Sequence, residues 1–194
     1  GNVLRDGTNG VYLFGVQAES DASRQFMTSY IPTSGSAVTR NQEKAFGAGN
    51  SSLINSTEGV LYAEIAALAD DLTFRAISLS NGTATNRVSI RYNNTSNSIS
   101  AFVYQGDTAV LSFNSVVSDI KDFHKVAIKY KSGEVSFWVD GVEVATSVST
   151  FTFLTLTDLS FIRGDSVRFF QGKVKTVAVF KEALTDDELE CLTS

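Results

Sequence analysis

The residues best suited to bind a ligand are cationic and aromatic side chains on the expected strands. Trp138 alternates with apolar neighbours, so it is expected on the outer face of its strand together with Ser136. Lys129 is expected on the equivalent face of the preceding strand, and Arg75 and Arg91 lie on two earlier strands. If these strands line one sheet, the four side chains form a shallow patch. Such a patch suits an acidic or sulfated glycan, because sugar rings stack on aromatic faces and sugar hydroxyls take hydrogen bonds.

A second interpretation of the same residues is structural. In it, a loop or the C-terminal helix covers Trp138, and the arginines pair with nearby carboxylates. Arg75 shares the face of Ile77 and Leu79.

Catalytic groups are not indicated by any motif. Cleavage of a glycosidic bond needs two carboxylates about 5–9.5 Å apart, and no expected strand carries acids at the matching alternate spacing. Glu64 is the one carboxylate within its strand. His124 is the single histidine, and there is no Gly-x-Ser-x-Gly elbow to accompany it. We therefore expect no catalytic residue and no enzyme, with a carbohydrate-active enzyme domain kept as an alternative.

Metal ligands are equally sparse. One histidine excludes sites that need two imidazoles, and Cys191 is the only cysteine, so no internal disulfide can form. Calcium takes six to eight oxygen ligands. Loop acids could contribute some, but no cage-like spacing appears, so we expect no cofactor; these acids are Asp70, Asp71, Asp107, Asp119 and Asp158.

Composition excludes further classes. The chain has 194 residues, 43% of them hydrophobic, which favours an ordered protein over a disordered one. Its net charge is −5 and no basic stripe is visible, so a nucleic-acid partner is not expected. No apolar run approaches the roughly 20 residues that cross a bilayer, so membrane insertion is not expected. The chain starts at Gly1 without an initiator methionine, and we expect it to be a piece of a longer protein.

Short alternating segments dominate the chain from residue 59 onward. Val126, Ile128 and Tyr130 share one face of such a segment, and Gly, Asn and Asp turns separate the segments. Many short antiparallel strands at regular spacing predict an all-β sandwich or barrel and not a parallel α/β sheet. The expected strands are Gly59–Leu68, Thr73–Leu79, Arg87–Tyr92, Ser98–Tyr104, Ala109–Phe113, Lys125–Tyr130, Glu134–Val139, Val142–Thr146, Leu159–Ile162 and Lys173–Phe180.

The two ends of the chain differ from this pattern. Thr185 followed by Glu188 forms a capping box, which predicts a short C-terminal helix. Residues 1–52 offer only the strand candidates Val11–Gln17 and Thr28–Ile31, followed by a polar, linker-like stretch. We therefore expect an extended N-terminal arm over 1–52 and one domain over 53–194.

Four segments carry a family resemblance: Gly59–Glu64, Phe123–Tyr130, Val135–Gly141 and Gly172–Phe180, followed by Ala183–Leu189. In this order and spacing they resemble the laminin-G-like, concanavalin-A-like jelly-roll family. The resemblance implies a jelly-roll sandwich that ends in a strand and a short helix with an acidic cap. It also implies a superfamily that includes glucan hydrolases and in which calcium is the commonest metal.

The N-terminal arm carries a second resemblance. Gly15–Glu19 and Thr28–Arg40 are similar to the closing strand and exit linker of sandwich domains in bacteriophage tail and fibre proteins. This implies a non-catalytic attachment module that binds a surface glycan or joins other fibre proteins, is located in the virion or outside the cell, and forms a homotrimer. A structural spacer without a ligand remains the alternative.

Overall fold

The computed structural model describes residues 30, 32, 36, 45, 47–152, 154–165 and 167–194. The chain divides into residues 1–42 and residues 43–194, and all the described strands and the helix belong to the second unit. Two segments near the N-terminus were expected to be strands, Val11–Gln17 and Thr28–Ile31. Apart from Tyr30, their residues lie outside the described part of the chain.

The ten strands expected from alternation are all present, with ends that differ by a few residues. Turn residues set these ends, because Gly, Asn and Asp tolerate the backbone angles that a reversal requires. The strands are β1 Glu58–Ala67, β2 Arg75–Ser80, β3 Arg87–Tyr92, β4 Ser98–Gln105, β5 Thr108–Val116, β6 His124–Lys131, β7 Val135–Val139, β8 Val142–Ser147, β9 Asp158–Ser160 and β10 Gly172–Phe180.

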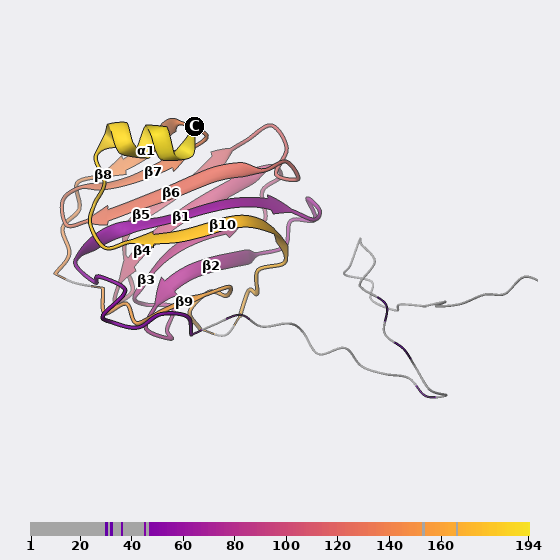
Figure 1. Cartoon of the computed structure of the whole chain (residues 1–194), viewed down its shortest axis with the longest axis horizontal. Helices are drawn as coiled ribbons and strands as arrows, with labels where there is room; N and C mark the ends of the chain where they lie inside the picture. Colours follow the sequence, from indigo (N-terminus) through magenta and orange to yellow (C-terminus); the bar gives the residue numbers. More distant parts are fainter. Residues whose placement is uncertain are drawn as a thin grey trace, which may run out of the picture. The chain divides into compact units, whose positions relative to one another are not determined.

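The strands form two stacked antiparallel sheets, which confirms the predicted sandwich (Figure 1). The front sheet has the order β10-β1-β6-β7-β8, and the back sheet has the order β5-β4-β3-β2-β9. Most neighbours in these orders are consecutive strands, but β1 lies between β6 and β10, and β2 lies beside β9. Each sheet therefore closes only when segments far apart along the chain meet.

The core lies between the two sheets and follows the alternation directly. Tyr130 of β6, Phe137 of β7 and Ile90 of β3 point inward and are fully buried or nearly so. Their strand neighbours point outward, because successive side chains of a strand face opposite sides. The two outer faces therefore hold the residues that remain for function.

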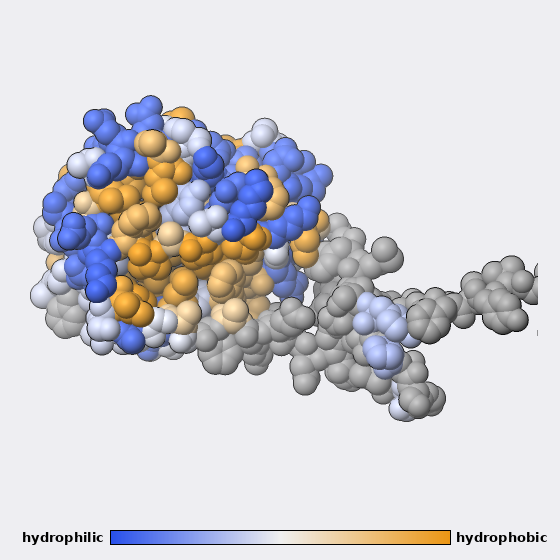
Figure 2. All heavy atoms as spheres, in the orientation of Figure 1, coloured by the Kyte–Doolittle hydropathy of each residue, from blue (hydrophilic) through white to orange (hydrophobic). Residues whose placement is uncertain are grey.

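Helix α1, Asp186–Thr193, lies over the outer face of the front sheet at the β7 and β8 end (Figure 1). Thr185 and Glu188 form the predicted capping box, and three acidic residues occupy the first turn, where the helix dipole favours negative charge. Figure 2 shows apolar atoms along this face below the helix. The helix closes a second, smaller core whose members are Val60, Tyr62, Ala127, Trp138 and Leu189, with Ala178, Phe180, Leu184 and Leu192 packed against them.

Backbone hydrogen bonding to the back sheet begins slightly before residue 53, where the domain was expected to start. Ala48 exchanges two backbone hydrogen bonds with Leu159 of β9, and Phe161 donates one to Ala45. A few residues assigned to the arm therefore border the back sheet.

No helix in the described part of the chain is long and apolar enough to span a membrane.

Candidate functional site

The four residues predicted to form one patch lie on two different sheets. Trp138 and Lys129 belong to β7 and β6 of the front sheet, whereas Arg75 and Arg91 belong to β2 and β3 of the back sheet. The sandwich core separates the two pairs. The structure therefore does not bring the predicted patch together, and each residue has its own surroundings.

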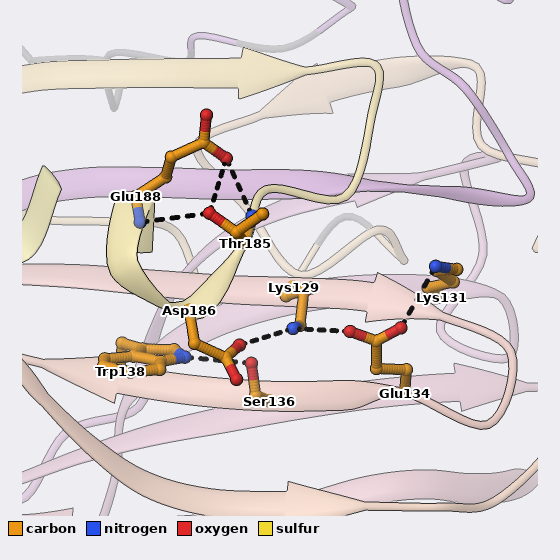
Figure 3. A network of polar contacts seen from close by, with 8 residues as sticks. All are labelled: Lys129, Lys131, Glu134, Ser136, Trp138, Thr185, Asp186 and Glu188. Carbon is orange, nitrogen blue, oxygen red and sulfur yellow. Dashed lines mark hydrogen bonds and ion pairs between the residues drawn. The ribbon is translucent and has the colours of Figure 1, made fainter. Parts of the chain in front are cut away.

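Trp138 is on the outer face of β7, as alternation predicted, but α1 covers it. Only 6% of the residue is exposed, and it packs in the small core with Leu189 of α1. Its Nε1 donates a hydrogen bond to Ser136 Oγ at 2.9 Å (Figure 3). The ring face that a sugar would need is therefore occupied by the protein itself.

Lys129 is buried beside it and anchors the start of α1. Its Nζ donates to Asp186 Oδ1 at 2.7 Å and to Glu134 Oε1 at 2.9 Å, and 2% of the residue is exposed (Figure 3). Burial alone would lower the pKa of Lys129, but the two carboxylates outweigh it and the pKa is raised. This ammonium is engaged within the chain.

Arg75 points toward the core side of the back sheet, in register with Tyr92 of β3. It is paired with Asp71 at 2.5 Å and donates to the Ala69 carbonyl at 3.3 Å. Burial would raise the pKa of Asp71, but the hydrogen bonds from Arg75 and Thr73 lower it overall. Arg75 therefore holds the loop before β2 in place.

Arg91 alone of the four lies on the outer face of the back sheet, where it is partly exposed within a continuous stack of cations and rings. Its guanidinium carbon is 4.0 Å from the ring centre of Phe102 and 5.0 Å from that of Phe74. Phe102 in turn stacks on Tyr104. We call this the arginine–aromatic stack, and its members in order are Arg168, Phe74, Arg91, Phe102, Tyr104 and Arg87.

Strand register builds the stack. Arg87 and Arg91 are four residues apart on β3, so they point to the same side. Arg87 lies directly opposite Tyr104 of β4, and Phe102, two residues earlier on β4, also points outward. Arginine over an aromatic face is favourable and fixes the plane of the guanidinium, so only its edge is left for another ligand.

The arginines of the stack have no ion-paired carboxylate among the described residues. Asp165, which is itself paired with Arg163, offsets the charges of Arg87 and Arg168 only in part, because burial and Arg163 still lower the pKa of both. Arg87, Arg91 and Arg168 form no ion pair with any described residue, and the Nε atoms of Arg87 and Arg91 are buried without a hydrogen-bond acceptor. Burial, followed by repulsion from Arg168, Arg87 and Arg163, lowers the pKa of Arg91 to about 10. Arg91 is still charged at neutral pH, and a bound anion would offset the repulsion between these cations.

The loop between β9 and β10 closes one side of this face. Ser78 Oγ donates to the Ile162 carbonyl at 2.5 Å and accepts from the Gly164 amide at 3.1 Å, so the loop crosses β2. Within it, Arg163 pairs with Asp165. Arg168 has a φ of +62°, a strained backbone for a non-glycine residue that is typical of functional sites.

The opposite side of the face, over β5, is open. Ser112 and Asn114 are exposed there. The Asn93 amide donates to Ser100 Oγ at 2.5 Å and to Asn114 Oδ1 at 3.1 Å, which orients both polar groups beside Arg91. The face therefore combines a cationic centre with a polar, solvent-facing flank.

Sequence reasoning missed most of this stack. Phe74, Arg87, Phe102, Tyr104 and Arg168 were not selected, although alternation already puts Arg87 with Arg91 and Phe102 with Tyr104. The missing information was which strands pair and in what register. The position of Arg168 depends on the loop path, for which the sequence carries no signal.

The remaining candidates are structural. Both ring nitrogens of His124 are engaged, Nδ1 with Asp140 Oδ2 at 2.5 Å and Nε2 with the Asp119 carbonyl at 3.0 Å. Asp70 accepts hydrogen bonds from Ser96 and Asn97. Among the described residues, no group of three or more acidic, histidine or cysteine side chains is placed to hold a metal ion.

Comparison with known proteins gives a family and several similar structures. A family model described as the concanavalin A-like lectin/glucanases superfamily matches residues 50–190. A CBM40 domain of Ruminococcus gnavus IT-sialidase, bound to α2,3-sialyllactose, superposes with a TM-score of 0.60 at 16% identity, covering 79% of this chain and 97% of the other. A search of curated proteins found no sequence match.

Two further structures share the fold. Domain 4 of a GH43 extracellular arabinanase from Geobacillus stearothermophilus, in complex with arabinotriose, has a TM-score of 0.57 at 11% identity and covers 73% of this chain and 69% of the other. Domains LG4-5 of the mouse laminin α1 chain have a TM-score of 0.53 at 13% identity and cover 74% and 40%. At these identities the likeness concerns the fold.

Proposed function

The chain belongs to the concanavalin A-like lectin/glucanases superfamily, and from that membership we propose that it is a non-catalytic module that binds an acidic glycan. The site is the arginine–aromatic stack on the outer face of β3 and β4. The fold of the chain is like that of carbohydrate-binding modules, including one bound to sialyllactose and one in complex with arabinotriose.

The observation that carries the proposal is the set of three arginines stacked on rings without an ion-paired carboxylate among the described residues. In a chain of net charge −5, one buried and two partly buried cations at neighbouring positions repel one another, and a bound anion offsets that repulsion. A carboxylate accepts two parallel hydrogen bonds from the edge of one guanidinium, and Arg91 stays partly exposed while Phe102 and Phe74 lie against its guanidinium. The adjoining rings and hydroxyls suit the sugar that carries the carboxylate.

Binding without cleavage is supported by the acids on the described part of this face. Asp165 is paired with Arg163, and Asp158 accepts hydrogen bonds from the hydroxyls of Thr157 and Ser160. Hydrolysis would need one carboxyl group free to act as an acid and a second free to act as a base or nucleophile. Engaged acids beside a cationic stack favour retention of an anionic sugar.

Replacing Arg91 by alanine should weaken binding of sialyllactose about 10- to 100-fold, because charge-assisted hydrogen bonds contribute about 1.5–3 kcal/mol. Titration calorimetry of sialyllactose and of lactose on the wild-type chain and the variant measures this. Lys173→Ala is the matched control, since it removes one exposed cation from β10 of the front sheet. Equal affinity for lactose and sialyllactose, or no effect of Arg91→Ala, would overturn the assignment.

We further propose that the module serves attachment in a phage tail fibre or a related surface adhesin, exposed on a virion or outside a cell. The linker-like sequence of Thr28–Arg40 supports this, as does its resemblance to fibre linkers. A structural spacer without a ligand is the competing assignment, and the same calorimetric titration separates the two.

A trimer is the expected assembly, by analogy with fibres. Sedimentation equilibrium of the whole chain should give three times the chain mass of 20.9 kDa, and removal of residues 1–42 should give a monomer. The truncation ends at Gln42 because Ala45 and Ala48 bond to the back sheet. A monomeric whole chain would contradict the trimer without affecting the glycan site.

A further inference from the structure

We propose that Ser112 and Asn114 of β5 form a second subsite, which binds a neutral sugar linked to the acidic sugar held at Arg91. This rests on the proposed function, and it names the ligand as an acidic sugar joined to a neutral one. The two residues are exposed on the outer face of the back sheet, beside the arginine–aromatic stack.

Strand register places the second subsite at a fixed separation from the first. Arg91 of β3 lies opposite Ser100 of β4, and Ser100 lies opposite Asn114 of β5. These three side chains share one row, and two strand spacings span about 10 Å. One sugar ring is too small to contact both ends of the row, whereas two linked rings reach from the guanidinium to the amide.

The donors of this subsite have no acceptor among the described residues, and one of them, the Asn114 amide, is held in place. Asn114 Oδ1 accepts from Asn93 Nδ2, so the Asn114 side chain is fixed with its own Nδ2 directed elsewhere. No described residue accepts from Asn114 Nδ2. Ser112 is in register with Phe102 of the stack, so its hydroxyl lies next to the ring that flanks Arg91. Amide and hydroxyl donors at a fixed spacing are what neutral sugars bind.

The closed side of the face sets the direction of the ligand. Ser78 and Ser80 of β2 are fully buried beneath the loop that carries Gly164 and Arg168. A glycan bound at Arg91 therefore cannot continue across β2. It continues across β5, so the acidic sugar is the terminal residue and its neutral neighbour lies over Ser112 and Asn114.

Calorimetry on the whole chain with matched probes tests this. The probes are the methyl glycosides of sialic acid and of glucuronic acid, and the same two sugars each linked to galactose. We expect the wild-type chain to bind at least one disaccharide 5- to 10-fold more tightly than its methyl glycoside. The double variant Ser112→Ala, Asn114→Ala should lose this difference and keep the affinity for the methyl glycoside.

Folding of the double variant is not at risk, because Asn93 keeps Ser100 and Ser98 as acceptors and both replaced side chains are exposed. Asn94→Ala, at an exposed asparagine of the β3–β4 turn, is the control and should retain the preference for the disaccharide. Equal wild-type affinity for both members of each pair overturns the second subsite and leaves the acidic-sugar site standing. Binding of no acidic probe at all overturns the proposed function as well.

Discussion

Replacing Trp138 by alanine should lower the free energy of unfolding by about 3–5 kcal/mol and leave glycan affinity unchanged. The ring fills the small core between β7 and α1, and its removal leaves a cavity that the helix cannot close. The hydrogen bond from Nε1 to Ser136 is lost as well. For a chain of this size, the loss corresponds to a fall in melting temperature of about 6–20 °C. Thermal unfolding followed by circular dichroism measures it.

Two companion variants make the result decisive. Trp138→Phe keeps most of the packing and loses the hydrogen bond, so it should cost about 1–2 kcal/mol and serves if the alanine variant does not fold. Phe123→Ala removes a partly exposed aromatic from the loop before β6, whose ring centre lies 4.2 Å from Lys175 Nζ, and should cost about 1 kcal/mol or less. If Trp138→Ala were as stable as the wild type and lost glycan binding, the ligand site would be on the front sheet.

The strands could be predicted from the sequence because alternation is a local property. Val126, Ile128 and Tyr130 identify the inner face of β6 without knowledge of any other strand, and the capping box at Thr185 identifies the start of α1. Where α1 would lie is a tertiary property. The alternation that correctly put Trp138 on an outer face carried no information on which element covers that face.

The candidate site could not be predicted from the sequence, because it depends on which strands pair in the back sheet and in what register. Arg91 was selected because it is a cation on a strand, but its partners Phe74 and Phe102 come from the loop before β2 and from β4, and only the register of the back sheet aligns them. Arg75 had a signal that favoured the structural interpretation, since it shares a face with Ile77. A cation on the core-facing side is expected to pair with an acid, as it does with Asp71.

A substitution of Gly59 by alanine should destabilise the sandwich by about 3–5 kcal/mol, the other large effect we expect. Gly59 has a φ of +154°, a region that other residues rarely adopt, and a Cβ there would lie 2.5 Å from the Phe180 carbonyl oxygen and 2.6 Å from the Tyr130 hydroxyl. The carbonyl belongs to the backbone of β10 and cannot turn away. Moving Tyr130 would break its hydrogen bond to the Asn55 carbonyl. Backbone strain and steric overlap each contribute about 1–3 kcal/mol.

Gly82 separates the two contributions. It also has a positive φ, +83°, but no atom lies within 4 Å of the point that an added Cβ would occupy, so Gly82→Ala adds backbone strain without overlap and should cost about 1–2 kcal/mol. Urea unfolding of both variants gives the difference in free energy at one temperature. Because β10 is the edge strand of the front sheet and pairs with β1, overlap at Gly59 separates that edge strand from the sheet, whereas Gly82 lies in the β2–β3 turn. Equal destabilisation of the two variants would mean that β1 and β10 pack loosely enough at Phe180 to accommodate the extra methyl group.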